Sequence, residues 1–263
     1  MQKTEYLAEL KQSYQLSSDT VRLDFFVTEL AGMFQPGQFL EIETNGLLKR
    51  PFACMYQDPE NDIISIGVKI VGDKSRYLSE LAIGSKLKLF APLGHGFRLK
   101  NSKKLIAVGG GSGIFALTEA CRQTAAKGGE VYFFCGFRNE NDAYDKELLE
   151  IDQCHYYRSS DMGGLDYHGN AVEAMRNILN RDKISLDDAL LIGCGPKGML
   201  RACKEFAAEN NLSCQLSLEE NMACGLGYCL GCAVDIIDEN GKNTRVRCCV
   251  EGPVFDAEKL ILS

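Results

Sequence analysis

The sequence predicts an antiparallel β barrel, then an α/β domain with a parallel sheet, then a small cysteine-rich module. Three observations along the 263 residues lead to this fold class. Short alternating apolar runs fill the first hundred residues, apolar runs alternate with helical stretches from Lys103 onward, and five cysteines crowd the segment after Glu220. We expect the three domains at residues 1–99, 100–215 and 216–263.

The first domain contains four runs with the alternation or β-branched composition of strands. They are VRLDFFV (residues 21–27), QFLEIE (38–43), DIISIGVKIV (62–71) and KLKLFAPL (86–93). Turn residues such as Gln35-Pro36-Gly37 and Asp58-Pro59-Glu60-Asn61 separate them. Several short strands at this spacing favour an antiparallel barrel.

The second domain begins with a buried apolar run, LIAV, followed by glycines, a helical stretch at residues 115–129 and a second apolar run at 131–137. This order predicts a β-α-β unit. A second unit follows, with a strand in DDALLIGCG (187–195), a helix from Lys197 to about Asn210, and a strand in LSCQLSLEE (212–220). We expect the parallel sheet to end there.

Two glycine-rich loops follow strands of this domain. The first consists of Gly109, Gly110, Gly111, Ser112 and Gly113, and the second contains Cys194, Gly195 and Pro196. Backbone N–H groups at the start of a helix favour phosphate, and ligands bind at the carboxyl edge of a parallel sheet. The first loop is neither a clean G-x-G-x-x-G nor a P-loop, so a simple tight turn is the alternative. Together the two loops favour a dinucleotide site.

The cysteines of the third domain have metal-ligand spacing. Cys224, Cys229 and Cys232 follow the pattern C-x4-C-x2-C, with Cys248 and Cys249 about sixteen residues later, which is typical of a plant-type [2Fe–2S] cluster. Zinc sites favour two C-x2-C pairs, so zinc is the weaker reading and inert buried thiols the weakest. Adjacent side chains of an extended chain point to opposite faces, so only one of Cys248 and Cys249 should reach iron, and spacing does not decide which.

Composition limits the partners and the compartment. The net charge of −7 and the dispersed 29 Lys and Arg disfavour nucleic acid. The sequence contains no apolar stretch long enough to span a membrane and no secretory signal, which predicts a cytoplasmic protein. A reducing compartment makes metal binding or burial the expected roles of the twelve cysteines. Those outside the cluster segment, except Cys194, are expected to be small buried apolar residues.

Several motifs together resemble the ferredoxin–NADP reductase superfamily and, within it, the electron-transfer subunits of class 1B dihydroorotate dehydrogenases. The resemblance runs nearly from end to end. The motifs that carry it are Arg50-Pro51-Phe52-Ala53, Lys69-Ile70-Val71-Gly72, APLGHGF (91–97), GGGSG (109–113), CGPKGM (194–199), SLEENMACGLGYCLGC (217–232) and Cys249-x-Glu-Gly-Pro-Val-Phe. In that family a barrel binds FAD, the α/β domain binds NAD, and the cluster module faces a partner subunit that contains FMN and oxidises dihydroorotate.

The resemblance implies residue roles. Arg50 is expected on the FAD pyrophosphate, where a guanidinium matches phosphate oxygens. The flavin-contacting stretches correspond to Arg50, Pro51, Phe52, Ala53, Gly67, Val68, Lys69, Lys74 and Ser75. The family's Cys-x-[Asp/Glu]-Gly-Pro motif selects Cys249 as the fourth cluster ligand, beside Cys224, Cys229 and Cys232. Cys194 is expected near the reacting carbon of the nicotinamide.

In this reading, FAD lies between the barrel and the α/β domain, and electrons pass from the partner's FMN through the cluster and FAD to NAD+. Flavin is needed because a hydride carries two electrons while a [2Fe–2S] cluster takes one. Glu140, Asp142 and Asp145 near Arg138 favour NAD over NADP, since a 2′-phosphate would repel them. The protein is expected to form a hetero-oligomer with this partner subunit.

Three departures from the family pattern motivate alternatives. Ala53 stands where the family has Ser, Lys74-Ser75 where it has Gly-Thr, and Phe115-Ala116 where it has Ala-Pro. The same electron conduit could serve a different partner, such as a hydrogenase, a transhydrogenase or another flavoenzyme. A non-enzymatic iron–sulfur redox sensor that has lost FAD is the alternative from another class.

Overall fold

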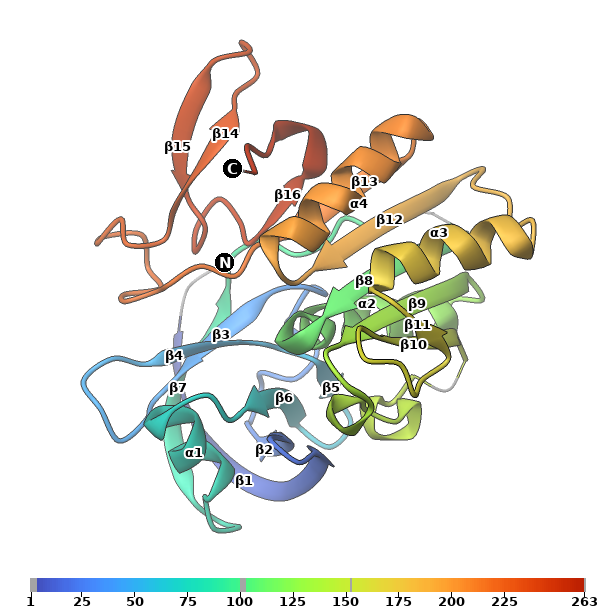
Figure 1. Cartoon of the computed structure of the whole chain (residues 1–263). Coiled ribbons are helices and arrows are strands. Elements are labelled where there is room, and N and C mark those ends of the chain that lie inside the picture. The colour runs from blue at the N-terminus through green and yellow to red at the C-terminus, as the bar shows by residue number, and fades with distance from the viewer. Residues whose placement is uncertain (1–3, 100–102, 152, 263) are drawn as a thin grey trace.

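A computed structural model describes residues 4–99, 103–151 and 153–262 (Figure 1). The expected boundary between the first two domains, at residues 99 and 100, adjoins residues 100–102, which lie outside the described residues, as do residues 1–3 of the segment searched for a signal. No helix in the described part of the chain is long and apolar enough to cross a bilayer.

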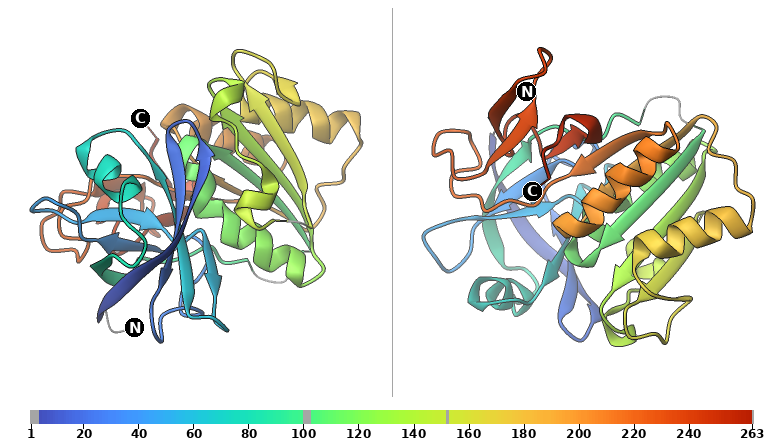
Figure 2. Two further views of the ribbon diagram at one scale, coloured as in Figure 1. Left: turned by 90° about the horizontal axis from the view of Figure 1, so that it is seen from below. Right: turned by 45° about the horizontal axis from the view of Figure 1, so that its top comes forward.

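Residues 4–93 form a curled antiparallel sheet of seven strands in the order β4-β3-β7-β1-β2-β6-β5 (Figure 2). The strands are β1 (Thr4–Ser17), β2 (Thr20–Phe26), β3 (Phe39–Ile42), β4 (Arg50–Ala53), β5 (Tyr56–Asp58), β6 (Ile63–Lys69) and β7 (Lys86–Leu93). The predicted antiparallel barrel is confirmed, and its four predicted runs correspond to β2, β3, β6 and β7. Helix α1 (Asp73–Ser79) follows β6.

Strands β1, β4 and β5 were not predicted. Strand β1 is long enough to pair with β7 through its first half and with β2 through its second, with a register shift between Leu10 and Gln12. Its polar side chains hide the alternation that buries Ala8 and Leu10 completely. Residues such as Phe25, Leu40 and Ile66 fill the barrel core around them.

A second seven-stranded sheet, formed by strands between Lys104 and Asp256, has the order β11-β10-β9-β8-β12-β13-β16. The strands are β8 (Lys104–Gly110), β9 (Glu130–Phe137), β10 (His155–Ser160), β11 (Tyr167–His168), β12 (Ala189–Cys194), β13 (Ser213–Ser217) and β16 (Val254–Asp256). The sheet is parallel from β11 to β13, as predicted for this domain. Its parallel part ends at β13, as expected, and β16 returns from the C-terminal module to extend the sheet by pairing antiparallel with β13.

Helices cover both faces of this sheet. Helix α2 (Ile114–Ala126) lies on the face turned toward the barrel, and α3 (Ala171–Arg181) and α4 (Lys197–Glu209) lie on the other (Figure 1). The helix predicted from Lys197 to about Asn210 is confirmed. Helix α3, which was not predicted, begins at the Asn170 side chain, which accepts the N–H groups of Val172 and Glu173. Short 3₁₀ turns lie at Gly111–Gly113, Glu140–Asp142, Lys146–Leu149 and Ala257–Lys259.

The C-terminal module consists of a cysteine-bearing loop and a two-stranded hairpin. Strands β14 (Ala233–Ile237) and β15 (Asn243–Arg247) form the hairpin, which projects from one end of the molecule (Figure 1). The module is tied to both other domains, since Asp256 of its strand β16 pairs with Gln215 of β13 and His95 N–H donates to the carbonyl of Gly252. These bonds hold the cysteine loop next to the barrel and the α/β domain.

Candidate functional site

A cavity of about 670 Å³ lies between the barrel and the α/β domain. The barrel supplies β4, the end of β6 and the start of α1 to its wall, and the α/β domain supplies the first glycine loop and α2. The wall residues are Arg50, Pro51, Phe52, Ala53, Gly67, Lys69, Val71, Gly72, Asp73, Lys74, Ser75, Ser112, Phe115 and Glu219. All the residues predicted to contact flavin lie in this wall except Val68, whose side chain is buried in the barrel core.

The polar side chains of the barrel wall are held by local contacts. Ser75 Oγ accepts the N–H groups of Val71 and Gly72, at 2.9 and 3.1 Å, and so stabilises the turn that starts α1. Lys69 Nζ lies 3.3 Å from the carboxylate of Asp19. Lys74 Nζ donates to the carbonyl of Leu48 at 3.5 Å, which joins α1 to the loop before β4. With Arg50, these lysines give the wall three cationic side chains.

Phe115 forms part of the floor of the cavity and requires glycine opposite. A Cβ atom on Gly67 would lie 2.3 to 2.4 Å from three atoms of the Phe115 ring. The ring is almost completely buried and stacks on Tyr144 with 5.3 Å between centroids. Gly67 therefore permits the close approach of β6 to α2 across the boundary between the two domains.

Glu219 follows β13 and points to the cavity from the side of the α/β domain. Ser112 Oγ donates to its Oε1 at 3.2 Å. Water reaches this carboxyl through the cavity, but the protein atoms packed around it raise its pKa, an effect that the hydrogen bond from Ser112 only partly offsets. The site thus places an acidic group with a raised pKa opposite the cationic wall of the barrel.

The two glycine loops touch each other at the carboxyl edge of the sheet. A Cβ atom on Gly113 would lie 2.3 Å from the carbonyl oxygen of Cys194, and one on Gly195 would lie 3.0 Å from the nitrogen of Gly110. Pro196 packs against Gly110 in the same way. Of the two loops only Ser112 lines the cavity. The other predicted residues of the loops do not belong to its wall, namely Gly109, Gly110, Gly111, Gly113, Gly195 and Pro196.

Cys194 ends β12 with its side chain buried. Burial raises the pKa of the thiol well above its ordinary value, and the nearby charge of Glu219 raises it further. It is therefore a neutral thiol close to Glu219 and does not belong to the cavity wall. Its predicted place beside the nicotinamide remains a prediction.

Four cysteine sulfurs of the C-terminal module lie in two adjacent pairs. The thiols of Cys224 and Cys229 interact with each other, and so do those of Cys232 and Cys249. Within the described residues, no three His, Cys, Asp or Glu side chains are grouped so that they could hold one metal ion. A centre with two irons and two thiolates on each iron needs two pairs rather than one tight group of four.

Backbone N–H groups point at each of these four sulfurs. Burial raises the pKa of the Cys224 thiol, but N–H groups of Cys229, Leu226 and Tyr228 outweigh it and the pKa falls to about 6. Gly231 N–H donates to Cys229 Sγ at 3.5 Å. N–H donors favour the thiolate form that iron requires, so these residues fit an iron–sulfur cluster.

The sulfurs of the other pair also face backbone N–H groups, although burial and the bond with Cys232 raise the pKa of the Cys249 thiol to about 12. Cys249 N–H donates to Cys232 Sγ at 3.4 Å, and Gly227 N–H donates to the sulfur of Cys249. The adjacent Cys248 is fully buried, and its own Sγ donates to the carbonyl of Leu218 at 3.5 Å. A sulfur that donates to a carbonyl stays a thiol, so the surroundings favour Cys249 over Cys248 as a ligand.

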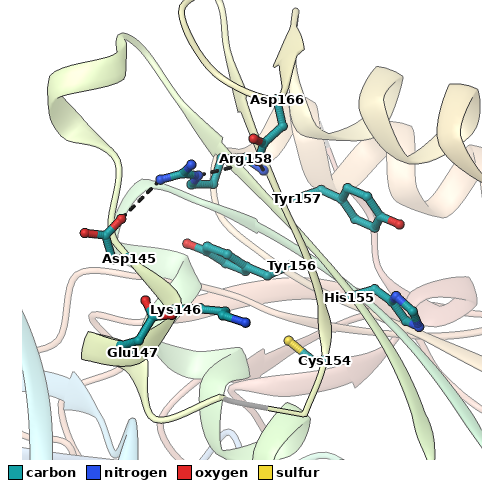
Figure 3. A pocket seen from close by; sticks show the side chains of 9 residues that line it. All are labelled: Asp145, Lys146, Glu147, Cys154, His155, Tyr156, Tyr157, Arg158 and Asp166. Atoms are coloured by element: carbon teal, nitrogen blue, oxygen red, sulfur yellow. Dashed lines mark hydrogen bonds and ion pairs between the residues drawn. The ribbon is translucent and has the colours of Figure 1, made fainter.

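A second cavity, of about 470 Å³, lies beside strand β10 (Figure 3). In its wall Arg158 bridges Asp145 at 3.2 Å and Asp166 at 3.4 Å. Tyr156 donates to the carbonyl of Tyr144 beside them. We give this cavity no role.

Comparison with known proteins agrees with this arrangement. Residues 219–261 match a protein-family model described as the iron–sulfur cluster binding domain of dihydroorotate dehydrogenase B. A curated protein of Caldanaerobacter subterraneus subsp. tengcongensis, named as the electron transfer subunit of dihydroorotate dehydrogenase B (NAD(+)), is 34% identical over 86% of this chain and 87% of its own length. One of the same name from Enterococcus faecalis is 30% identical over the whole of both chains. The chain belongs to the family of dihydroorotate dehydrogenase B electron transfer subunits.

The fold of this family member is also that of solved structures. A chain from the structure of an NADH-dependent reduced ferredoxin–NADP oxidoreductase, studied for flavin-based electron bifurcation, has a TM-score of 0.83. It covers 97% of this chain and 90% of its own length at 23% identity. The likeness confirms the barrel and α/β architecture predicted from the resemblance.

Reasoning from the sequence did not predict five of the wall residues of this electron transfer subunit as site residues, namely Val71, Gly72, Asp73, Phe115 and Glu219. Phe115 had been noted only as a departure from the family pattern, although a large residue there signals a different floor for the cavity. Glu219 follows the carboxyl end of β13, and ligand-binding residues of parallel sheets gather at that edge. That rule could have identified Glu219, but its position beside the cysteines drew attention to the cluster instead.

Proposed function

We propose that this protein passes electrons between an FMN-containing dihydroorotate dehydrogenase subunit and NAD+, through a [2Fe–2S] cluster and FAD. The observation that carries the proposal is the arrangement of four sulfurs in two pairs, each sulfur facing backbone N–H groups, within the segment that matches the family's cluster domain. We propose Cys224, Cys229, Cys232 and Cys249 as the ligands.

FAD is proposed in the cavity between the two large domains. Arg50, Lys69 and Lys74 supply cationic groups for its two phosphates, and Arg50 can bind both oxygens of one phosphate through its planar fork. Phe52 and Phe115 supply apolar surface for the rings. When bound, FAD exchanges two electrons with a nicotinamide as a hydride and single electrons with the cluster. The chain's residues bind and orient it.

The nicotinamide nucleotide is proposed at the two touching glycine loops. Their backbone N–H groups lie at the start of α2 and α4, where the helix dipole favours phosphate. Ser112 and Glu219 then lie where this site meets the flavin cavity, and Cys194 is buried close to Glu219. We propose NAD+ rather than NADP+, because Glu140 and Asp142 follow the exposed Arg138 at the end of β9.

The proposal includes the division into domains at residues 1–99, 100–215 and 216–263. It also places the protein in the cytoplasm, as a hetero-oligomer with the FMN-containing subunit. All twelve cysteines lie in the described part of the chain, where no disulfide joins any two of them, which suits a reducing compartment.

The experiment that tests this function is to purify the protein anaerobically, quantify iron and flavin, and record its absorbance before and after NADH. We expect about two irons and one FAD per chain, with flavin absorbance that NADH bleaches. NADPH at the same concentration serves as the matched comparison. Iron without flavin, flavin that NADH cannot reduce, or a preference for NADPH would each overturn the corresponding part of the proposal.

A further inference from the structure

Arg247 connects the hairpin to the cluster loop, by which we mean residues 224–232. It is the last residue of β15 and directly precedes Cys248 and Cys249. Its guanidinium turns back to the cluster loop, where Nη1 donates to the carbonyl of Gly227 at 3.3 Å. The same guanidinium holds the carboxylate of Glu251, with Nε 3.2 Å from Oε2 and Nη2 bonded to Oε1.

Gly227 links this guanidinium to a ligand sulfur. Its carbonyl accepts from Arg247, and its N–H donates to the sulfur of Cys249. Its φ is +89°, and a Cβ atom there would lie 3.2 Å from Arg247 Nη1 and 2.6 Å from Val250 Cγ2. A glycine therefore lets the guanidinium approach the loop closely. Arg247 is also near enough to the sulfurs of Cys249 and Cys232 for their charges to interact with its own.

Glu251 completes a compact ion pair beside the cluster. Its Oε2 accepts the backbone N–H of Arg247 at 2.7 Å, and its own N–H donates to the Arg247 carbonyl at 2.9 Å. The two side chains are 37% and 35% exposed, so water and salt screen their charges only in part. The pair therefore places one positive and one negative charge in fixed positions next to the ligands.

We propose that Arg247 and Glu251 set the reduction potential of the cluster, with Arg247 raising it and Glu251 lowering it. The inference rests on the proposed function, since it requires the cluster. The property concerned is the equilibrium for adding one electron to the cluster, in which no bond breaks and no proton moves. The reduced cluster carries one more negative charge, so a nearby cation favours reduction and a nearby anion opposes it. Arg247 and Glu251 act as positioning residues because neither supplies a ligand.

The test is an anaerobic redox titration of the intact, cluster-loaded protein, followed by the electron paramagnetic resonance signal of the reduced cluster. We expect Arg247→Gln to lower the equilibrium constant for reduction about tenfold, which is about 59 mV for one electron. Glu251→Gln is expected to change it in the opposite direction. Arg247→Lys keeps the positive charge but not the planar fork, so we expect the equilibrium constant for reduction to change by less than about threefold.

The matched control is Arg245→Gln, because Arg245 lies on the same strand and also pairs with an acid, Asp235, at 2.8 Å. Its side chain is 68% exposed, so we expect the midpoint to stay within about twofold of the wild type. Opposite changes for Arg247→Gln and Glu251→Gln separate an electrostatic role from a structural one, since loss of structure would move both variants in one direction.

The test distinguishes failure of the proposed function from failure of the role proposed for the ion pair. A wild-type protein that contains no iron–sulfur cluster contradicts the proposed function itself. A wild-type protein with a normal cluster, together with Arg247→Gln and Glu251→Gln variants that keep their iron but show the wild-type midpoint, overturns the role of the ion pair alone. If Arg247→Gln loses its iron, Glu251→Gln decides, because an unchanged midpoint in that variant overturns the role of the ion pair as well.

Discussion

The close packing of Gly67 on the Phe115 ring predicts that Gly67→Ala destabilises the protein, whereas alanine at Gly198, which has open space, does not. In Gly67→Ala the new methyl would lie 2.3 to 2.4 Å from the Phe115 ring, which is fixed by burial and by stacking on Tyr144. Extra atoms in a packed interior cost about 1–3 kcal/mol of unfolding free energy. For a chain of this size this lowers the melting temperature by about 2–12 °C.

The same substitution is expected to weaken FAD binding, because Gly67 and Phe115 both line the cavity. If the ring relieves the strain by moving into the cavity, the FAD dissociation constant rises by up to about two orders of magnitude. Thermal unfolding followed by circular dichroism measures the first effect, and flavin fluorescence during titration measures the second.

Gly198→Ala is the matched control. Gly198 lies in α4, and no atom lies within 4 Å of a Cβ placed there. Alanine restricts the unfolded chain and suits a helix, so this variant is expected to gain about 0.4–1 kcal/mol. If Gly67→Ala proves as stable as Gly198→Ala and binds FAD with wild-type affinity, the packing of Phe115 on Gly67 is not as described.

The cluster and its surroundings give three more predictions. Cys249→Ser should abolish the visible absorbance of the cluster while Cys248→Ala retains it, and the reverse result would exchange the two assignments. Gly225→Ala should lose iron, since φ there is +57° and a Cβ atom would lie 2.4 Å from the carboxyl carbon of Glu41; iron analysis that finds full occupancy contradicts this. Because the pKa of Glu219 is raised on folding, the folded state holds the proton more tightly than the unfolded state. This contribution to stability is fully present below pH 4.5 and is lost as pH rises through the pKa of the folded state. The unfolding free energy of Glu219→Gln should therefore increase relative to that of the wild type as pH rises, by less than about 1 kcal/mol because water reaches the carboxyl. Urea unfolding at several pH values measures this, and a difference that stays constant with pH would refute the pKa shift.

The sequence predicted the elements whose pattern is local. Strand β7 and helix α4 have clear alternation or helical composition between turn residues, and they were found nearly at their observed bounds. Strand β1 was missed because its exposed face is rich in charged and polar residues. Strand β16 was missed because three residues carry no periodicity, and only pairing with β13 makes them a strand.

The candidate site likewise contains residues that spacing along the sequence identifies and residues that only tertiary contacts decide. Spacing identified Cys224, Cys229 and Cys232, but it left Cys248 and Cys249 undecided because that choice depends on which way each side chain points. The observed difference comes from tertiary contacts, namely the carbonyl of Leu218 at Cys248 and the N–H of Gly227 at Cys249. Val68 was grouped with the flavin contacts by its neighbours in the sequence, but alternation along β6 turns its side chain into the barrel core.

The most direct test of the proposed function is electron transfer through the assembled complex. The protein is combined with the FMN-containing catalytic subunit, dihydroorotate and NAD+ are added without oxygen, and NADH formation is followed. We predict NADH formation with the wild type and none with Cys249→Ser, while the catalytic subunit in both samples still reduces an artificial dye with dihydroorotate. NADH formation at the wild-type rate with Cys249→Ser, or its absence with a wild type that holds iron and FAD, would contradict the proposed path of electrons.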